Sequence, residues 1–243
     1  NMGWMNDFLG YMEQDPYFRC HHYNELTFSM IYAYSENFVL VFSHDEVVHG
    51  KGSLVNKMPG QTFEDKFANL RAAYGFMMGH PGKKLLFMGQ DFGQFHEWDE
   101  KVSLDWYLTK EPFHADLQNY VKGLLTLYHK YPALYRLDEE YDGFQWINAN
   151  DGDRSIFSFI RRDETQKKNL LFICNFTPVD RDDYRVGVPK RGTYTLLLDQ
   201  EHGYYKRGDK ISHYRSIKSE CDGQPYSFAY PLPAYGTAVF RFS

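Results

Sequence analysis

The chain of 243 residues is long enough for one large domain or two modest ones, and 43% hydrophobic residues can build a folded core. Its 27 Lys and Arg residues are outnumbered by 32 Asp and Glu residues, which gives a formal charge of −5. Nucleic acids and anionic membranes require a basic surface, so this balance excludes both as expected partners. No apolar run reaches the roughly 18 residues of a membrane span.

Three cysteines, Cys20, Cys174 and Cys221, are few and have no regular spacing. They indicate reduced thiols and a cytoplasmic protein. The chain opens on residues 1–5 (NMGWM), with neither an initiator Met nor a secretory leader, so we expect a segment of a longer protein. Aromatic residues make up 18% of the chain, and their flat apolar faces suit sugar rings as well as a core.

The first half of the chain predicts helices alternating with strands. Apolar residues follow helical spacing over residues 5–12, and residues 38–42 are apolar throughout, as in a strand buried on both faces. Thr62 with Asp65 predicts a capped helix that stops at residues 79–82 (GHPG). The apolar face of that helix is expected to contain Phe67, Leu70, Tyr74, Met77 and Met78.

A second buried strand is predicted at residues 85–88. A long loop then leads to a further helix, which Pro132 stops and whose apolar face is expected to hold Leu117, Val121, Leu124, Leu125 and Tyr128. This order predicts parallel strands with helical crossovers, whose carboxyl-end loops open onto one mouth. Two strands cannot close a barrel of eight, so either the sheet is small and open or the remaining strands lie upstream.

The second half predicts an antiparallel all-β domain. Short runs rich in β-branched and aromatic residues occupy residues 155–161, 170–175, 193–198 and 237–242. The pairs Asp142-Gly143, Asp151-Gly152 and Asp222-Gly223 mark turns between strands. We therefore expect an α/β domain over residues 1–135 and an all-β domain over residues 136–243.

Polar side chains are most concentrated in residues 43–50 (SHDEVVHG). His44, Asp45, Glu46 and His49 are candidate metal ligands, although their spacing differs from the H-E-x-x-H pattern. A Ser-His-Asp triad is disfavoured because consecutive residues point in different directions and the chain has no G-x-S-x-G elbow. The remaining alternatives are a polar loop with a capping Asp, and a carboxylate with an imidazole that hold sugar hydroxyls beside a glycosidic bond.

Residues 42–53 (FSHDEVVHGKGS) resemble the fourth signature region of the alpha-amylase superfamily, in the form found in bacterial 1,4-alpha-glucan (glycogen) branching enzymes. Other segments are similar to that family in the same order along the chain: residues 1–5, 56–60 (NKMPG), 85–94 (LLFMGQDFGQ), 97–98 (EW), 104–106 (LDW), 131–135 (YPALY), 143–147 (GFQWI), 175–178 (NFTP) and 184–189 (YRVGVP). The resemblance implies the C-terminal part of a (β/α)8 TIM barrel followed by an antiparallel β-sandwich.

The resemblance also implies a retaining mechanism, in which an Asp attacks the anomeric carbon and a Glu donates and later accepts the proton. The family places both groups after the fourth and fifth strands, upstream of Asn1, so this chain alone is expected to be inactive. Asp45 matches the third carboxylate and His44 its neighbour, and both are implied to bind the sugar at the cleavage subsite. Substrate-binding roles are implied for Trp4, Glu46, Gln90, Asp91 and Trp98.

Two departures from the family pattern stand out. Asp91 replaces the usual Glu, and residues 201–225 are rich in Tyr and charge and match loosely. The implied activity is transfer of an α-1,4-glucan segment to a 6-hydroxyl in glycogen biosynthesis, with no metal or organic cofactor. Its implied partners are an α-glucan (glycogen or amylose) and the upstream half of the barrel. A hydrolase of the same superfamily and a non-catalytic glucan-binding module remain alternatives.

Overall fold

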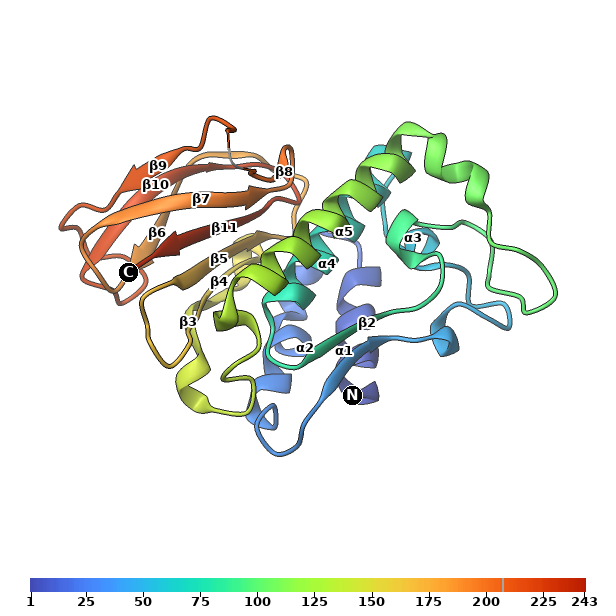
Figure 1. The fold of residues 1–243 in the computed structure, drawn as a ribbon, viewed down its shortest axis with the longest axis horizontal. Coiled ribbons are helices and arrows are strands. Elements are labelled where there is room, and N and C mark those ends of the chain that lie inside the picture. Colours follow the sequence, from blue (N-terminus) through green and yellow to red (C-terminus); the bar gives the residue numbers. More distant parts are fainter. Residues whose placement is uncertain (207) are drawn as a thin grey trace.

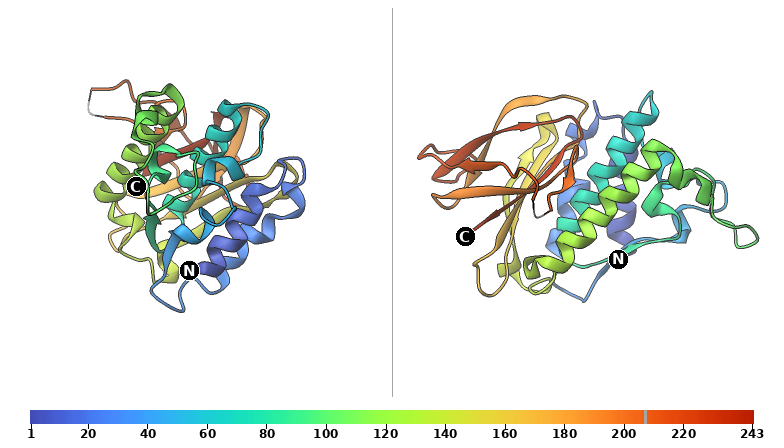
Figure 2. Two further views of the ribbon diagram at one scale, coloured as in Figure 1. Left: turned by 90° about the vertical axis from the view of Figure 1, so that its right-hand side faces the viewer. Right: turned by 45° about the horizontal axis from the view of Figure 1, so that its top comes forward.

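A computed structural model describes residues 1–206 and 208–243 of the chain. A mixed α/β region comes first and an antiparallel β region follows, which confirms the predicted fold class. The α-helices are α1 (Met2–Glu13), α2 (Tyr23–Thr27), α3 (Leu54–Lys57), α4 (Phe63–Gly79) and α5 (Pro112–Lys130). In Figure 1, α4 and α5 lie between the antiparallel strands on the left and β2 on the right, and the right-hand view of Figure 2 shows the same order.

The first sheet contains two parallel strands, β1 (Val39–Phe42) and β2 (Lys83–Leu86), which α4 connects. Val39 pairs with Lys83 and Phe42 with Leu86, so both strands end at the same edge. The backbone N–H of Phe87 continues this pairing by donating to the carbonyl of Phe42 at 3.1 Å. The second strand therefore begins two residues earlier than the sequence predicts, because the pairing starts beside Val39.

Burial of this sheet on both faces was predicted, and that prediction is wrong. Leu40 and Phe42 point into the core, but Val39 and Leu85 on the other face are 38% and 39% exposed. Register places these two exposed positions on the same side of the sheet as Val41 and Lys83. A run of apolar residues indicates that both faces of a strand are suited to burial. It does not show whether other residues of the described chain pack on both faces.

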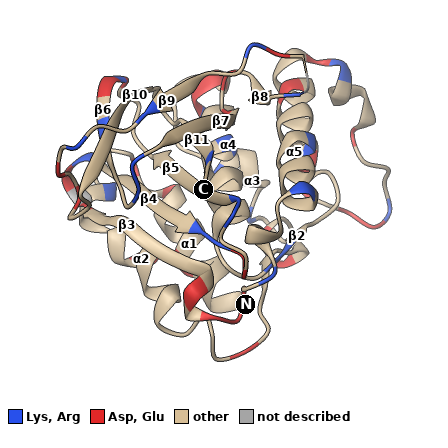
Figure 3. Ribbon diagram, turned by 60° about the vertical axis from the view of Figure 1, so that its left-hand side comes forward, with Lys and Arg blue, Asp and Glu red and all other residues tan. Residues whose placement is uncertain are grey.

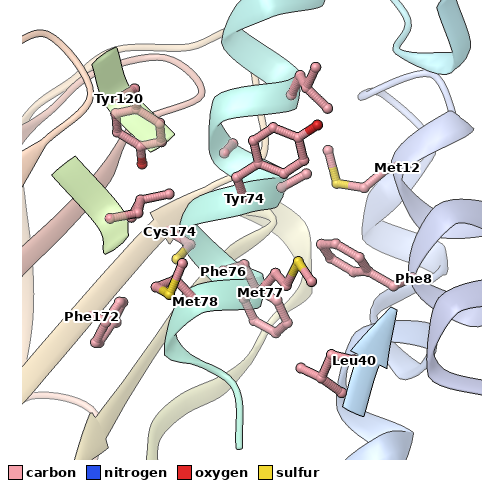
Figure 4. Packing of buried hydrophobic residues seen from close by; sticks show 14 of the residues in the cluster. Phe8, Met12, Leu40, Tyr74, Phe76, Met77, Met78, Tyr120, Phe172 and Cys174 are labelled. Atoms are coloured by element: carbon pink, nitrogen blue, oxygen red, sulfur yellow. The ribbon is translucent and has the colours of Figure 1, made fainter. Parts of the chain in front are cut away.

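Helix α4 begins as predicted, with a reciprocal capping box between Thr62 and Asp65, and it ends at Gly79. Its burial extends much further around the helix than the predicted apolar face. In Figure 4, Phe8, Leu40 and Met77 lie on one side of α4, while Phe172 and Cys174 lie on the other. The helix is therefore packed between α1 and β1 on one side and the antiparallel sheet on the other.

Two glycines allow α4 to approach the antiparallel sheet closely. A Cβ added at Gly75 would lie 2.6 Å from the hydroxyl oxygen of Thr237, and one at Gly79 would lie 2.6 Å from the ring of Phe159. Both distances are far below van der Waals contact, and the side chains of Thr237 and Phe159 are fully buried, so they have little room to shift. The helix-to-sheet distance thus depends on these two positions.

Helix α5 starts with Pro112 in its first turn and is followed by a 3₁₀ turn at Pro132–Leu134. Leu117, Val121 and Leu124 are buried, as predicted. Leu125, which was also assigned to the buried face, is 47% exposed, so that assignment is wrong. The helical position next to Leu124 is rotated by about 100°, which takes Leu125 out of the packed face.

The antiparallel region forms two packed sheets. The larger sheet has the strand order β3-β4-β5-β11-β7-β8, with β9 also pairing β7, and the smaller sheet pairs β10 with β6. The strands are β3 (Phe144–Asp151), β4 (Ile156–Arg161), β5 (Asn169–Asn175), β6 (Arg181–Val188), β7 (Thr193–Asp199), β8 (Gly203–Tyr204), β9 (His213–Arg215), β10 (Tyr226–Leu232) and β11 (Thr237–Phe242). The four strands expected from the sequence correspond to β4, β5, β7 and β11.

One hydrophobic core continues from the helices into the larger sheet. Phe76 on α4 contacts Phe159 on β4 edge to face, with 5.7 Å between ring centroids. A second core lies between the two sheets of the β region and includes Val186, Phe228 and Phe240. The larger sheet therefore has helices on one face and the smaller sheet on the other.

His80, at the end of α4, is 2% exposed and lies among the rings of Trp4, Phe76 and Phe144. Its Nδ1 donates to the carbonyl of Pro81 at 2.8 Å, so its Nε2 accepts from the Ser29 hydroxyl at 2.8 Å. Burial lowers the pKa of His80 to about 3 from its ordinary 6.5. The folded protein therefore keeps a neutral imidazole at pH values where the unfolded chain binds a proton.

This difference makes the free energy of unfolding fall as the pH drops from 6.5 towards 3, by about 1.4 kcal/mol per pH unit from His80 alone. We expect His80→Gln to remove that component, so the loss between pH 7 and pH 5 becomes smaller by about 2 kcal/mol. Urea unfolding of both proteins at the two pH values measures it. An unchanged pH dependence in His80→Gln would contradict the assigned protonation state.

None of the helices in the described ranges combines the length and the apolar composition needed to cross a membrane. Cys20, Cys174 and Cys221 are free thiols, as the sequence predicts. Lys and Arg residues are interspersed with Asp and Glu residues over the β strands and α5 in the view of Figure 3.

Candidate functional site

Two polar loops meet beyond the carboxyl ends of β1 and β2. Ser43 follows β1, and its hydroxyl accepts the backbone N–H of Asp45 at 3.3 Å, which starts a 3₁₀ turn at His44–Glu46. Ser43 thus occupies the capping position that one interpretation of the sequence gave to Asp45. The parallel pairing of β1 with β2 then brings the loop after Phe87 beside this turn.

His44 and Asp45 present their side chains to solvent at this edge. Their side chains are 54% and 50% exposed, and His44 Nε2 lies 3.5 Å from Asp45 Oδ1. The remaining Asp45 oxygen, Oδ2, accepts the Ser43 hydroxyl at 3.0 Å. The rings of Phe87 and Trp98 lie 5.7 and 6.5 Å from the imidazole of His44. A carboxylate and an imidazole therefore project together beside an aromatic wall.

Glu97 connects the two loops. Its carboxylate accepts the backbone N–H of Gly50 at 3.0 Å and that of Gly52 at 2.6 Å. These two bonds, that of Gly52 first, hold the pKa of Glu97 below its ordinary value. The neighbouring Trp98 N–H donates to the carbonyl of Val47 at 2.9 Å. The sequence alone did not single out Glu97 as a site residue, because its role depends on glycine N–H groups about 45 residues earlier.

Glu46 is turned towards lysines. Its side chain is 18% exposed and lies 3.0 Å from Lys51 Nζ and 3.8 Å from Lys57 Nζ. Lys57 also lies 3.3 Å from Glu13 at the end of α1. These ion pairs join α1 to the loop that carries Asp45, and they occupy the carboxylate for which substrate binding was expected.

Gln90 and Asp91 lie in a 3₁₀ turn directly after β2. Gln90 is 5% exposed; its Oε1 accepts the Phe87 N–H at 2.9 Å, while its Nε2 is buried without a hydrogen-bond partner among the described residues. Asp91 Oδ2 accepts from Gln118 on α5 at 3.1 Å. The turn therefore places an unused amide donor in the wall of this loop cluster and holds Asp91 against α5.

The expected stacking role of Trp4 is wrong for this structure. Trp4 is 1% exposed, and its ring packs on Phe8 and Phe42 with centroids 5.0 and 5.5 Å apart. The sequence contained a signal for this packing, since Trp4 and Phe8 are four residues apart on one face of α1. Trp98 differs from Trp4 in that it is half-buried and lies beside His44.

The metal interpretation of residues 44–49 finds no geometric support. Within residues 1–206 and 208–243, no three His, Cys, Asp or Glu side chains are grouped so that they could hold one ion. Glu46 is engaged by lysines, and His49 adopts a left-handed backbone conformation with φ of 59°. What the loops offer instead is an open arrangement of acceptors and rings, which suits hydrogen bonds to a polyhydroxylated ligand.

Residues 146–243 match the family model of the alpha-amylase C-terminal all-beta domain. The whole chain is 51% identical to the 1,4-alpha-glucan branching enzyme GlgB of Butyrivibrio fibrisolvens and covers 38% of that protein. It is 49% identical to the GlgB enzymes of Aquifex aeolicus and Cereibacter sphaeroides, with 96% and 98% of this chain and 37% and 33% of those proteins covered. The chain thus spans little more than a third of the length of these relatives.

A solved structure with the same fold is the catalytic module of the glycogen-degrading pneumococcal virulence factor SpuA. It superposes with a TM-score of 0.61 over 89% of this chain and 39% of that chain. The sequence identity is 13%, so this likeness concerns the fold.

Proposed function

We propose that this chain, a homologue of 1,4-alpha-glucan branching enzymes along its whole length, forms the part of such an enzyme that binds the glucan at the bond being transferred. The observation that carries the proposal is the placement of His44 and Asp45. They project together into solvent from the carboxyl end of a parallel strand, in a chain that is 51% identical to a branching enzyme over its whole length. In a (β/α)8 barrel, that end of the strands holds the chemistry.

The roles follow from the charge that develops during transfer. An upstream Asp attacks the anomeric carbon while an upstream Glu protonates the leaving oxygen, and a 6-hydroxyl later displaces the enzyme from the glycosyl intermediate. The transition state has oxocarbenium character, so a carboxylate that holds ring hydroxyls binds it more tightly than the ground state. Asp45 takes this role, and His44 donates to or accepts from a hydroxyl of the same sugar.

The uncovered face of the small sheet supports the presence of further barrel strands in the complete protein. Val39 and Leu85 form an apolar strip that water contacts in this chain. Exposed strand faces of this kind occur where another layer of the fold packs. The proposed partner for this face is the upstream half of the same barrel.

The nature of the proposed ligand agrees with the charges of the chain. An α-glucan is neutral, and the chain carries a formal charge of −5 with both signs interspersed in Figure 3. Nucleic acid and membrane are not proposed as partners, and the proposed chemistry uses neither a metal nor an organic cofactor. We propose a cytoplasmic location for the protein, because free thiols are typical of cytoplasmic proteins and the proposed activity is glycogen synthesis.

Branching is distinguished from hydrolysis by the acceptor. We would place residues 1–243 in a chimera, where they replace the matching segment of the Butyrivibrio fibrisolvens enzyme. With amylose as substrate, we expect the iodine absorption spectrum to change without release of reducing ends. The unmodified relative serves as the positive control, and the 243-residue chain alone is expected to show no turnover.

Two outcomes would overturn the proposal. Release of reducing ends in proportion to the iodine change would identify a hydrolase. Glucan binding by a folded chimera without either change would identify a non-catalytic module.

A further inference from the structure

A cavity lies in the β region, between the end of β7, strands β9 and β10, and the start of β6. Its volume is about 350 Å³, at the lower end of the range of small-ligand sites (roughly 300 to 1,000 Å³). Helices α4 and α5 separate this part of the molecule from β1 and β2 (Figure 1). The residues that characterise its lining are Tyr205, Tyr214, Tyr230, Asp182, Asp199 and Glu201.

The three tyrosines are held in place by the β region. Tyr205 donates its hydroxyl to Asp199 Oδ2 at 2.7 Å, and the His202 ring stacks on Tyr205 with 4.2 Å between centroids. Tyr214 meets Tyr230 edge to face at 5.4 Å. Rings fixed in this way offer apolar surface at low entropic cost to a ligand.

Tyr230 carries a hydroxyl that makes no hydrogen bond within the described part of the chain. Tyr230 is only 4% exposed, and its ring packs against the ring of Phe240 with 5.1 Å between centroids. No hydrogen bond joins its hydroxyl to any of the described residues, and the side chain lines the cavity. The hydroxyl oxygen is not among the fully buried side-chain atoms, so it is reachable from the cavity and available to a ligand there.

The charge of the lining limits the class of ligand. Asp180, Asp182, Asp199 and Glu201 are acidic, and no Lys or Arg belongs to the lining that the structure describes. Four carboxylates repel anions, so phosphates and acidic sugars are excluded. The described side chains also provide no group of three or more His, Cys, Asp or Glu that could hold a metal ion. A neutral polyol remains, because carboxylates accept its hydroxyls and tyrosine rings cover its apolar faces.

We propose that this cavity is a second binding site for an α-glucan chain, separate from the loops after β1 and β2. This proposal rests on the proposed function for the identity of the sugar. The site is built largely by residues 199–205, residues 212–214 and β10, and these residues overlap the Tyr-rich segment whose sequence matched the family loosely. A long glucan bound here by one segment would stay attached to the protein while its other segments bind and leave the transfer site.

The test measures binding of maltoheptaose to the 243-residue chain with Asp45→Asn, so that the transfer site contributes little. We expect Tyr230→Phe, which removes only the unpartnered hydroxyl, to weaken binding about three- to tenfold. Tyr226→Phe on the same strand is the matched control, because Tyr226 does not line the cavity, and it should bind as before. An acidic oligosaccharide of the same length should not bind.

Equal affinities of the Tyr230→Phe and Tyr226→Phe proteins for maltoheptaose would overturn the site, as would binding of a polyamine in place of maltoheptaose.

An experiment with the chimera distinguishes a failure of this site from a failure of the proposed function. There, Tyr230→Phe should leave branching of short amylose unchanged while retention on immobilised glycogen falls. The chimera without the Tyr230 substitution could also fail to branch amylose while it still binds glucan through Tyr230. That result would contradict the proposed function but would support this second binding site.

Discussion

Replacing Asp45 with Asn should lower kcat of the chimera by about a hundredfold or more, which corresponds to a barrier higher by at least roughly 2.7 kcal/mol. Asn keeps the shape of the side chain and replaces a charged acceptor with a neutral amide. Hydrogen bonds to a charged group strengthen as positive charge develops on the sugar, so the charge itself contributes to the rate. Steady-state kinetics with amylose measures the effect.

The thermal midpoint of Asp45→Asn should change little. Asp45 is half exposed, and the described side chains that it contacts are Ser43 and His44. His44→Ala should reduce kcat less, because it removes hydrogen bonding without removing a formal charge. Asp99→Asn is a matched control, since Asp99 is an exposed residue whose carboxylate accepts, among the described residues, only the nearby Lys101 N–H. An unchanged kcat in Asp45→Asn would end the catalytic assignment.

The largest expected effect on stability comes from Asp138, which pairs with Arg161 where the helices meet the larger sheet. Arg161 is fully buried, with its guanidinium 2.6 Å from Asp138 Oδ1 and 2.7 Å from the carbonyl of Gly79. Burial alone would raise the pKa of Asp138, but the charges of Arg161 and Lys84 outweigh burial and hold that pKa below its ordinary value. The carboxylate is therefore charged at neutral pH and balances the buried cation.

We expect Asp138→Ala to lower the free energy of unfolding by about 3–5 kcal/mol, because it leaves Arg161 buried without its counter-ion. The thermal midpoint should fall by about 10 °C. Lys83→Met is the matched control: Lys83 contacts the same carboxylate at 3.2 Å but is 55% exposed, so its loss should cost less than about 1 kcal/mol. Similar losses in the two variants, measured by urea unfolding, would show that burial does not decide the strength of this pair.

The sequence predicted those parts of the fold that local chemistry determines. The Thr62–Asp65 capping box and the stop after Gly79 each depend on a few neighbouring residues, and both are present. The convergence of the loops after β1 and β2 followed from the alternation of strands and helices. The expected turn at Asp222-Gly223 is also present, with positive φ at both residues.

Features that depend on distant partners could not be read from local patterns. Strand β6 opens with three polar residues, and β9 has only three residues, so local pattern alone does not give the bounds of either strand. They are strands because β10 and β7 pair with them. Likewise, the role of Glu97 depends on loop geometry, and the burial of Arg161 depends on a carboxylate 23 residues earlier in the chain.

The central claim is that this chain completes a branching enzyme, and the linkages in the product test it most directly. Amylose would be incubated with the chimera, and the proportion of α-1,6 linkages would be followed by proton NMR. We expect α-1,6 linkages to accumulate while the number of reducing ends stays constant, and we expect Asp45→Asn to slow this accumulation about a hundredfold. A folded chimera that releases reducing ends and forms no α-1,6 linkages would contradict the account.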